Sequence, residues 1–208
     1  MADTASASTR RPGVLGVHSL DRFVFTVPEL DAAEAFYRAF GLDVRRQGQR
    51  LDLHTFGHPH CWGSVFAAGG AKKLQYLSLG IYADDVAAFR ERVQRLGLGT
   101  EPHPLADREG IWLRNPDGVS MQLVVADKSS PSRKSQPTVL PVVPPGAGAA
   151  PGRSRVKPVR PRRLSHVLLF TPDVLRMVAF CRDALGLRLS DHSGDGIAFV
   201  HGVHGSDH

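Results

Sequence analysis

Cysteine is scarce in this sequence, and long apolar runs are absent. Only Cys61 and Cys181 occur among 208 residues, and their separation does not match the spacing of zinc ligands. So few thiols are typical of a protein kept in a reducing cytoplasm. No stretch approaches the roughly 20 apolar residues that span a membrane, and the N-terminus lacks the apolar core of a secretory signal. We therefore expect a cytoplasmic protein with no membrane partner.

Acidic residues are missing from positions 128–163. This stretch holds nine Lys and Arg, so removing its nine charges from the net charge of +6 leaves −3 for the rest of the chain. It also contains no aromatic residue. Nucleic-acid-binding proteins need basic residues on a folded surface, with aromatic side chains for stacking. The charge pattern therefore argues against a nucleic-acid partner.

Proline marks the division of the chain. Residues 127–163 contain eight of the fifteen prolines and show no periodic apolar face, which is typical of a solvated connector. A connector of this length is better interpreted as a boundary between modules than as a loop within one. Residues 1–13 are small and polar, and we predict a disordered tail there.

Residues 14–126 repeat one pattern of elements. Runs of β-branched and aromatic residues alternate with amphipathic stretches, in the order strand, helix, three strands. Asp31 and Asp173 are expected to cap helices. Strands are predicted over 19–27, 42–46, 51–56, 62–67, 74–82, 110–114 and 120–125, with a weak candidate broken by prolines at 100–105, and helices over 31–40 and 84–96.

Residues 164–208 begin the pattern a third time. A strand is predicted over 164–170, a helix over 173–185, and strands over 187–190 and 197–201. Pro172 corresponds to Pro28 of the first unit, and in the same alignment of the repeats His166 corresponds to Arg22. One such unit alone would expose an apolar face and an unpaired strand edge. The second module is therefore predicted to be incomplete or completed by a partner chain, and the open edge favours a homo-oligomer.

Three sequence features carry a resemblance to a known superfamily. They are the helix end Phe36-Tyr37-Arg38 with Gly41-Leu42, the unit start Ala83-Asp84-Asp85, and the turn Asn115-Pro116-Asp117-Gly118. With the strand–proline–helix opening, they resemble the vicinal oxygen chelate superfamily (glyoxalases, bleomycin resistance proteins and extradiol dioxygenases). The resemblance is strongest to the two-module extradiol, catechol-type dioxygenases. It implies an α+β fold of paired βαβββ units, with one complete module (14–126) and the first unit (164–208) of a second, catalytic module.

The resemblance also implies where a metal would bind. The family's ligands come from the first strand of one unit and from the first and last strands of the other, and in the first module these positions fall near Arg22, Ser78 and Gln122. Arginine is a cation, and serine and glutamine are weak substitutes for the histidine and carboxylate that ferrous iron prefers. We therefore interpret residues 14–126 as a metal-free module.

By itself, a lone histidine at the start of a strand is more often a core residue than a ligand. By resemblance, however, His166 occupies the first metal-ligand position of the second module. The remaining histidine and glutamate ligands are expected beyond residue 208, so the 208-residue chain alone is expected to be inactive. His208 falls near the family's catalytic histidine, which handles protons. The implied cofactor is Fe(II), or Mn(II), and the implied substrates are an aromatic diol and O2.

Two other functions of the same fold stay open. One is a metal-free protein that binds or sequesters small molecules, and the other is a glyoxalase- or epimerase-type enzyme, which the ligand pattern disfavours. Among the other histidines, His58 and His60 are predicted to be solvated in a turn, and His201 and His204 to be structural or substrate-facing. His18, His54 and His103 also lie in the module interpreted as metal-free. The cup of the binding protein would be lined by Phe23, Phe25, Trp62, Phe66, Tyr76 and Trp112.

Overall fold

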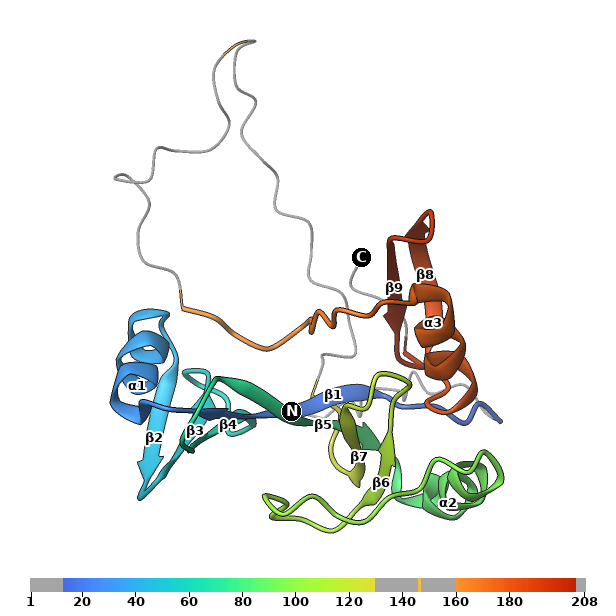
Figure 1. Cartoon of the computed structure of the whole chain (residues 1–208), viewed down its shortest axis with the longest axis horizontal. Coiled ribbons are helices and arrows are strands. Elements are labelled where there is room, and N and C mark those ends of the chain that lie inside the picture. The colour runs from blue at the N-terminus through green and yellow to red at the C-terminus, as the bar shows by residue number, and fades with distance from the viewer. Residues whose placement is uncertain (1–12, 130–145, 147–159, 205–208) are drawn as a thin grey trace, which may run out of the picture.

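The computed structural model describes residues 13–129, 146 and 160–204 (Figure 1). The α+β class predicted from the sequence is confirmed. The elements are β1 (Ser19–Val27), α1 (Leu30–Ala39), β2 (Asp43–Gln47), β3 (Arg50–His54), β4 (Cys61–Ala67), β5 (Lys73–Ile81), the short 3-10 helix η1 (Ala83–Asp85), α2 (Val86–Arg95), β6 (Ile111–Arg114), β7 (Ser120–Val125), α3 (Val174–Asp183), β8 (Arg188–Ser193) and β9 (Ile197–His201).

Strands β1 to β7 form one sheet in the order β2-β3-β4-β1-β5-β7-β6. Its two halves meet where β1 and β5 pair antiparallel. On its other side, β1 pairs with the parallel strand β4, and β5 pairs with the parallel strand β7. The predicted strand over 100–105 is wrong, because only a single bridge between Gly99 and Leu113 forms there. Pro102 and Pro104 lack the amide hydrogens that a longer ladder would need.

The two faces of this sheet have different chemistry. On one face, β-strand side chains and the apolar stripe of α1 form a core that includes Leu30, Leu51, Leu53 and Val65. A second core on that face contains Phe89 and Val93 of α2, together with side chains of β5, β6 and β7. Successive strand residues point to opposite faces. The other face therefore carries the alternate positions of the strands, and we call this face the cup.

The third unit packs beside the second one (Figure 1). Buried residues of α3, including Met177 and Phe180, join the same core as α2. Val17 donates a backbone hydrogen bond to Leu185 and accepts one from Val203, at 2.9 and 3.0 Å. Gly186 has φ +67°, and a side chain there would meet the Leu15 carbonyl oxygen at 2.3 Å. The close approach of these two segments therefore requires glycine.

Two local predictions for helix and strand are wrong. Residues 164–170 are not a strand, because no described residue makes a backbone–backbone hydrogen bond with them, and a strand exists only as part of a ladder. Asp31 does not cap α1, whose N-cap is Glu29, without a side-chain hydrogen bond. Asp173 does cap α3, since its carboxylate accepts a hydrogen bond from the Arg176 amide at 2.9 Å.

Most of the predicted tail (1–13) and linker (127–163) lies outside the described residues. The described ends of the linker are attached to the first module. Ser129 donates a hydrogen bond to the Leu20 carbonyl at 2.6 Å, and Thr55 donates one to the Arg162 carbonyl at 2.8 Å. In the ranges that the structure covers, no helix is long and apolar enough to cross a membrane.

Candidate functional site

The three positions that the family resemblance marks as metal-ligand positions come together in the cup. Arg22 of β1 is the register partner of Ser78 of β5, which is in turn the partner of Gln122 of β7. All three side chains are buried, and the Ser78 hydroxyl donates a hydrogen bond to the Gln122 amide oxygen at 3.2 Å. The three positions chosen from the sequence therefore lie side by side on neighbouring strands.

An ion pair between the buried Arg22 and the partly exposed Asp107 fills the centre of the site. The Arg22 guanidinium is bound by both carboxylate oxygens of Asp107, with one contact of 2.9 Å. Burial is the largest single influence and lowers the pKa of Arg22, but the hydrogen bond with Asp107 and the electrostatic interactions with Tyr76 and Asp107 together raise this pKa above its ordinary value. The same hydrogen bond lowers the pKa of Asp107 to about 2. Both groups are therefore charged at neutral pH.

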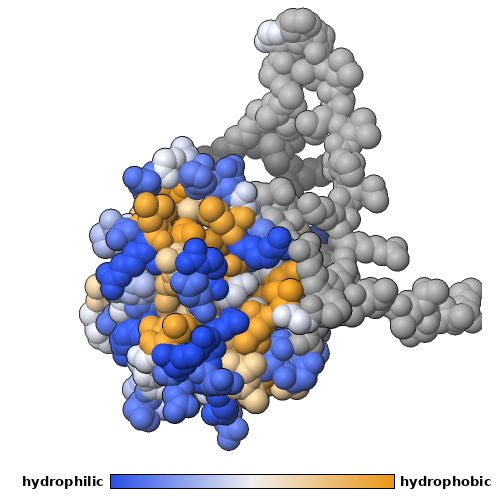
Figure 2. Space-filling view, turned by 90° about the vertical axis from the view of Figure 1, so that its right-hand side faces the viewer, coloured by the Kyte–Doolittle hydropathy of each residue, from blue (hydrophilic) through white to orange (hydrophobic). Residues whose placement is uncertain are grey.

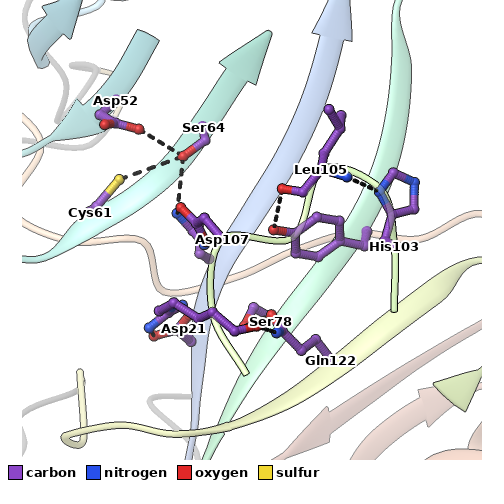
Figure 3. A network of polar contacts seen from close by, with 12 residues as sticks. Asp21, Asp52, Cys61, Ser64, Ser78, His103, Leu105, Asp107 and Gln122 are labelled. Atoms are coloured by element: carbon purple, nitrogen blue, oxygen red, sulfur yellow. Dashed lines mark hydrogen bonds and ion pairs between the residues drawn. The ribbon is translucent and has the colours of Figure 1, made fainter. Parts of the chain in front are cut away.

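Further polar side chains extend the ion pair across the sheet (Figure 3). Arg50 contacts Asp107 at 2.9 Å and Asp52 at 2.6 Å. The Ser64 hydroxyl donates to Asp52 at 2.8 Å and accepts from Arg22 at 3.3 Å. Each buried charge thus has an opposite charge or a hydrogen-bond partner, which is the condition for burying it without a large loss of stability.

The loop that carries Asp107 closes the cup. Leu105 packs against Tyr76 and Trp112 in an apolar cluster, and the Tyr76 hydroxyl donates to the Leu105 carbonyl at 3.4 Å. The predicted aromatic lining is therefore partly wrong, since Phe23 and Phe25 pack in the helix-side cores. Of the predicted lining residues, Trp62, Phe66, Tyr76 and Trp112 occupy cup-side positions.

These residues do not fit a metal ion. The first-strand position holds a cation already paired with a carboxylate, and the other two positions hold neutral oxygens bonded to each other. Among the described residues, no group of three or more His, Cys, Asp or Glu is placed to hold a metal. The donor set of the first cup thus agrees with its interpretation as metal-free.

Asp107 was not singled out from the sequence. A buried arginine at position 22 requires a nearby carboxylate, but nothing in the order of residues shows which of the twenty Asp and Glu supplies it. Asp107 lies in an irregular loop 85 residues away in sequence, so neither strand periodicity nor register could select it. The sequence analysis also did not identify Asp52 and Ser64 as polar residues on the cup side of the sheet.

Acid should weaken this network within a defined pH range. Because the pKa of Asp107 is depressed to about 2 from 3.8, its contribution to stability is present above about pH 4 and is lost as the pH falls toward 2. We expect the difference in urea midpoint between the native chain and Asp107→Asn to shrink over this range. A difference that stays constant from pH 5 to pH 2 would contradict the assigned ion pair.

The second module presents His166 on an exposed segment. Its Nδ1 lies 3.0 Å from the Ser165 hydroxyl, and the segment leads to Pro172 and α3. His166 is not among the groups that cluster as metal ligands in the described part of the chain. His208, the predicted catalytic histidine, lies outside the described residues. The structure therefore describes only one of the two predicted site residues.

The other histidines mostly serve structural contacts. His204 Nε2 lies 2.5 Å from the Tyr82 hydroxyl. The Tyr82 ring also contacts the His18 ring, at 4.6 Å between centroids. Burial lowers the pKa of His18. His58 is exposed as predicted, but His60 is half-buried against Trp62, at 4.4 Å between ring centroids. Burial also lowers the pKa of His54 and His103. His201 Nδ1 lies 2.6 Å from the Ser190 hydroxyl.

Comparison with known proteins adds a close sequence relative. No family model matches the chain. Metapyrocatechase 2 from Cupriavidus necator is 46% identical over 193 residues, which make up 92% of this chain and 59% of that protein. The chain thus spans about three fifths of the length of this relative.

Solved structures share the fold. A Mn(II)-bound glyoxalase from Novosphingobium aromaticivorans superposes with a TM-score of 0.64 at 21% identity, over 89% of this chain and 58% of that one. A 2,3-dioxygenase from Pseudomonas sp. KL28 gives 0.63 at 20% identity, over 89% and 65% of the two chains. A variant of homoprotocatechuate 2,3-dioxygenase from Brevibacterium fuscum gives 0.63 at 17% identity, over 93% and 53%. Identities this low indicate the fold alone.

Proposed function

We propose that the chain is a member of the vicinal oxygen chelate superfamily and the N-terminal part of an extradiol dioxygenase that opens a catecholic ring with O2. The similarity to metapyrocatechase 2 carries this proposal. A match of 193 residues is too long for the first module alone, so it includes the linker and the third unit. We take the arrangement of module, tether and third unit to be shared by the two proteins.

The two modules would have different roles, one structural and the other metal-binding. The first cup is filled by the Arg22–Asp107 pair and cannot accept a metal, so its role would be structural. His166 replaces Arg22 at the equivalent position of the third unit and would supply one imidazole to the metal, which we take to be Fe(II), with Mn(II) as the alternative. A single imidazole does not make a complete site, so no catalytic step is assigned to this chain's residues. Free Cys61 and Cys181 suit a cytoplasmic location.

A chimera tests the proposal directly. The chain would be fused through residue 204 to the part of metapyrocatechase 2 that lies outside the matched region, loaded with Fe(II), and assayed with catechol for the yellow ring-opened product. We expect turnover by the chimera, none by the 208-residue chain alone, and a loss of at least about 100-fold in chimeric His166→Ala. His192→Ala, at an exposed histidine of β8, is the matched control and should retain activity. Robust turnover by the 208-residue chain, or by chimeric His166→Ala, would exclude the assigned role.

One observation favours the metal-free binding alternative. A cavity of about 710 Å³ lies beside the filled cup, and its lining includes Phe66, Leu105, His103, Lys72 and Lys73. If the first module binds aromatic ligands there, titration should change tryptophan fluorescence through nearby Trp112, whether or not a chelator is present. Tight, chelator-insensitive binding would favour the binding protein, and its absence would favour the dioxygenase.

A further inference from the structure

The cavity beside the filled cup is lined by residues of the first module. Its volume of about 710 Å³ lies within the roughly 300–1,000 Å³ that is usual for small-molecule sites. Three neighbouring strands supply part of the lining, because Thr26 of β1 is the register partner of Phe66 of β4 and of Lys73 of β5. The loop before β6 supplies His103 and Leu105. Neither the linker nor the third unit contributes a described lining residue.

The charged side chains that line the cavity are positive. Lys72 and Lys73 are both exposed, and none of the described lining residues is Asp or Glu. Burial lowers the pKa of His103, and the nearby charges of Lys73 and Arg114 lower it further. The positive potential of Lys73 therefore reaches into the cavity as far as His103. A cavity with cations and no carboxylate in its lining favours an anionic ligand.

Two further lining residues offer hydrogen-bond donors. His103 Nδ1 accepts a hydrogen bond from the Leu105 amide at 3.1 Å, so the neutral ring carries its proton on Nε2. The Thr26 hydroxyl accepts a hydrogen bond from the Gln75 side-chain amide at 2.7 Å, so it can donate its own proton. Together with the lysine ammonium groups, these donors suit a carboxylate, whose oxygens only accept hydrogen bonds.

Apolar side chains form another part of the lining. They are Phe66, Ala67, Ala68, Ala71, Pro104 and Leu105. The Arg50 guanidinium lies over the Phe66 ring, 5.4 Å from its centroid, and the His103 ring stacks on Trp112, at 6.4 Å between centroids. These contacts hold the two rings in place beside the cavity. An aromatic ligand can therefore pack against a preformed apolar surface next to the donors.

We propose that this cavity binds a small aromatic carboxylate, with its carboxylate at Lys73 and His103 and its ring between Phe66 and Leu105. The ligand class rests on the binding role that is given above as the alternative function of this cavity. Ring cleavage at the second module does not exclude it, because the two sites would lie in different modules. A ligand as small as benzoate should bind with a Kd on the order of 1 mM, which is not the tight binding expected of a sequestering protein.

Matched probes test the ligand class on the 208-residue chain. Benzoate carries both the ring and the charge, benzamide carries the ring alone, and acetate carries the charge alone. Titration calorimetry should show saturable binding of benzoate, at least about 10-fold tighter than that of benzamide or acetate, and weaker at higher salt. No binding of benzoate at several millimolar, or equal binding of benzamide, would overturn the proposal.

A charge variant and a matched control locate the site. Lys73→Gln should weaken benzoate binding about 10-fold. Arg95→Gln also removes one positive charge, but Arg95 is exposed at the end of α2 and does not line the cavity, so the affinity should stay unchanged. Helix α2 lies at the end of the molecule that faces the viewer in Figure 2, where hydrophilic side chains surround apolar patches. Equal effects of the two substitutions, or none of Lys73→Gln, would contradict the assigned site.

The catechol assay separates this proposal from the proposed dioxygenase activity. Benzoate binding by the 208-residue chain, with no turnover by the chimera, would count against the dioxygenase and support the anion site. Turnover by the chimera, with no benzoate binding by the chain, would count against the anion site alone. Circular dichroism checks that Lys73→Gln and Arg95→Gln fold as the native chain does, so that a lost affinity reports on the cavity.

Discussion

Asp107→Asn is expected to lower the free energy of unfolding by about 3 kcal/mol, because it leaves the buried Arg22 guanidinium without its counter-charge. Arg22 is only 4% exposed, so its guanidinium depends on protein groups for its counter-charge, although the Asp107 side chain itself is 33% exposed. Asparagine preserves the size of the side chain, and its amide oxygen can still accept one hydrogen bond. The loss should therefore report on charge and not on packing. Urea unfolding followed by tryptophan fluorescence measures it.

Two further variants make this prediction specific. Asp31→Asn removes a carboxylate from an ion pair with Arg46, but Asp31 is 85% exposed, so no measurable change in stability is expected. Adding Arg22→Met to Asp107→Asn should restore part of the lost stability, because it removes the unpaired buried charge. If Asp107→Asn is no more harmful than Asp31→Asn, the cup does not depend on this ion pair.

Phe180→Ala is expected to lower the free energy of unfolding of the third unit by about 3 kcal/mol and to loosen it from the first module. Phe180 lies on the buried face of α3, is 8% exposed, and joins the core formed by β5, β6, β7 and α2. Its removal leaves a cavity at the place where the two modules meet. Hydrogen exchange measured by mass spectrometry should show faster exchange over 174–201, with β1 to β4 little changed.

The matched control lies on the same helix. Leu175 is 59% exposed, so Leu175→Ala should change stability by less than about 0.5 kcal/mol and leave the exchange pattern as it is. Uniform acceleration of exchange across all strands in Phe180→Ala would show instead that the chain unfolds as one cooperative unit. Equal effects of the two substitutions would contradict the packing of α3 described above.

Much of the fold followed from local patterns. Residues 19–27 and 120–125 combine β-branched and apolar residues with clear ends, and the observed strands have the predicted bounds. Failures occurred where a pattern needs a partner to become structure. Residues 164–170 have the composition of a strand, but backbone hydrogen bonds to a neighbour define a strand, and composition cannot supply them. The weak candidate at 100–105 failed because its prolines cannot donate to a ladder.

The candidate site divides in the same way. The resemblance read from the sequence placed Arg22, Ser78 and Gln122 at the metal-ligand positions of the first module, and the sequence by itself determined that they make poor metal ligands, because side-chain chemistry is a local property. Only the tertiary structure decided that Asp107 neutralises Arg22 and that its loop fills the cup. Such a contact joins residues 85 positions apart. It depends on how an irregular loop crosses the sheet, and no periodic pattern in the chain encodes that path.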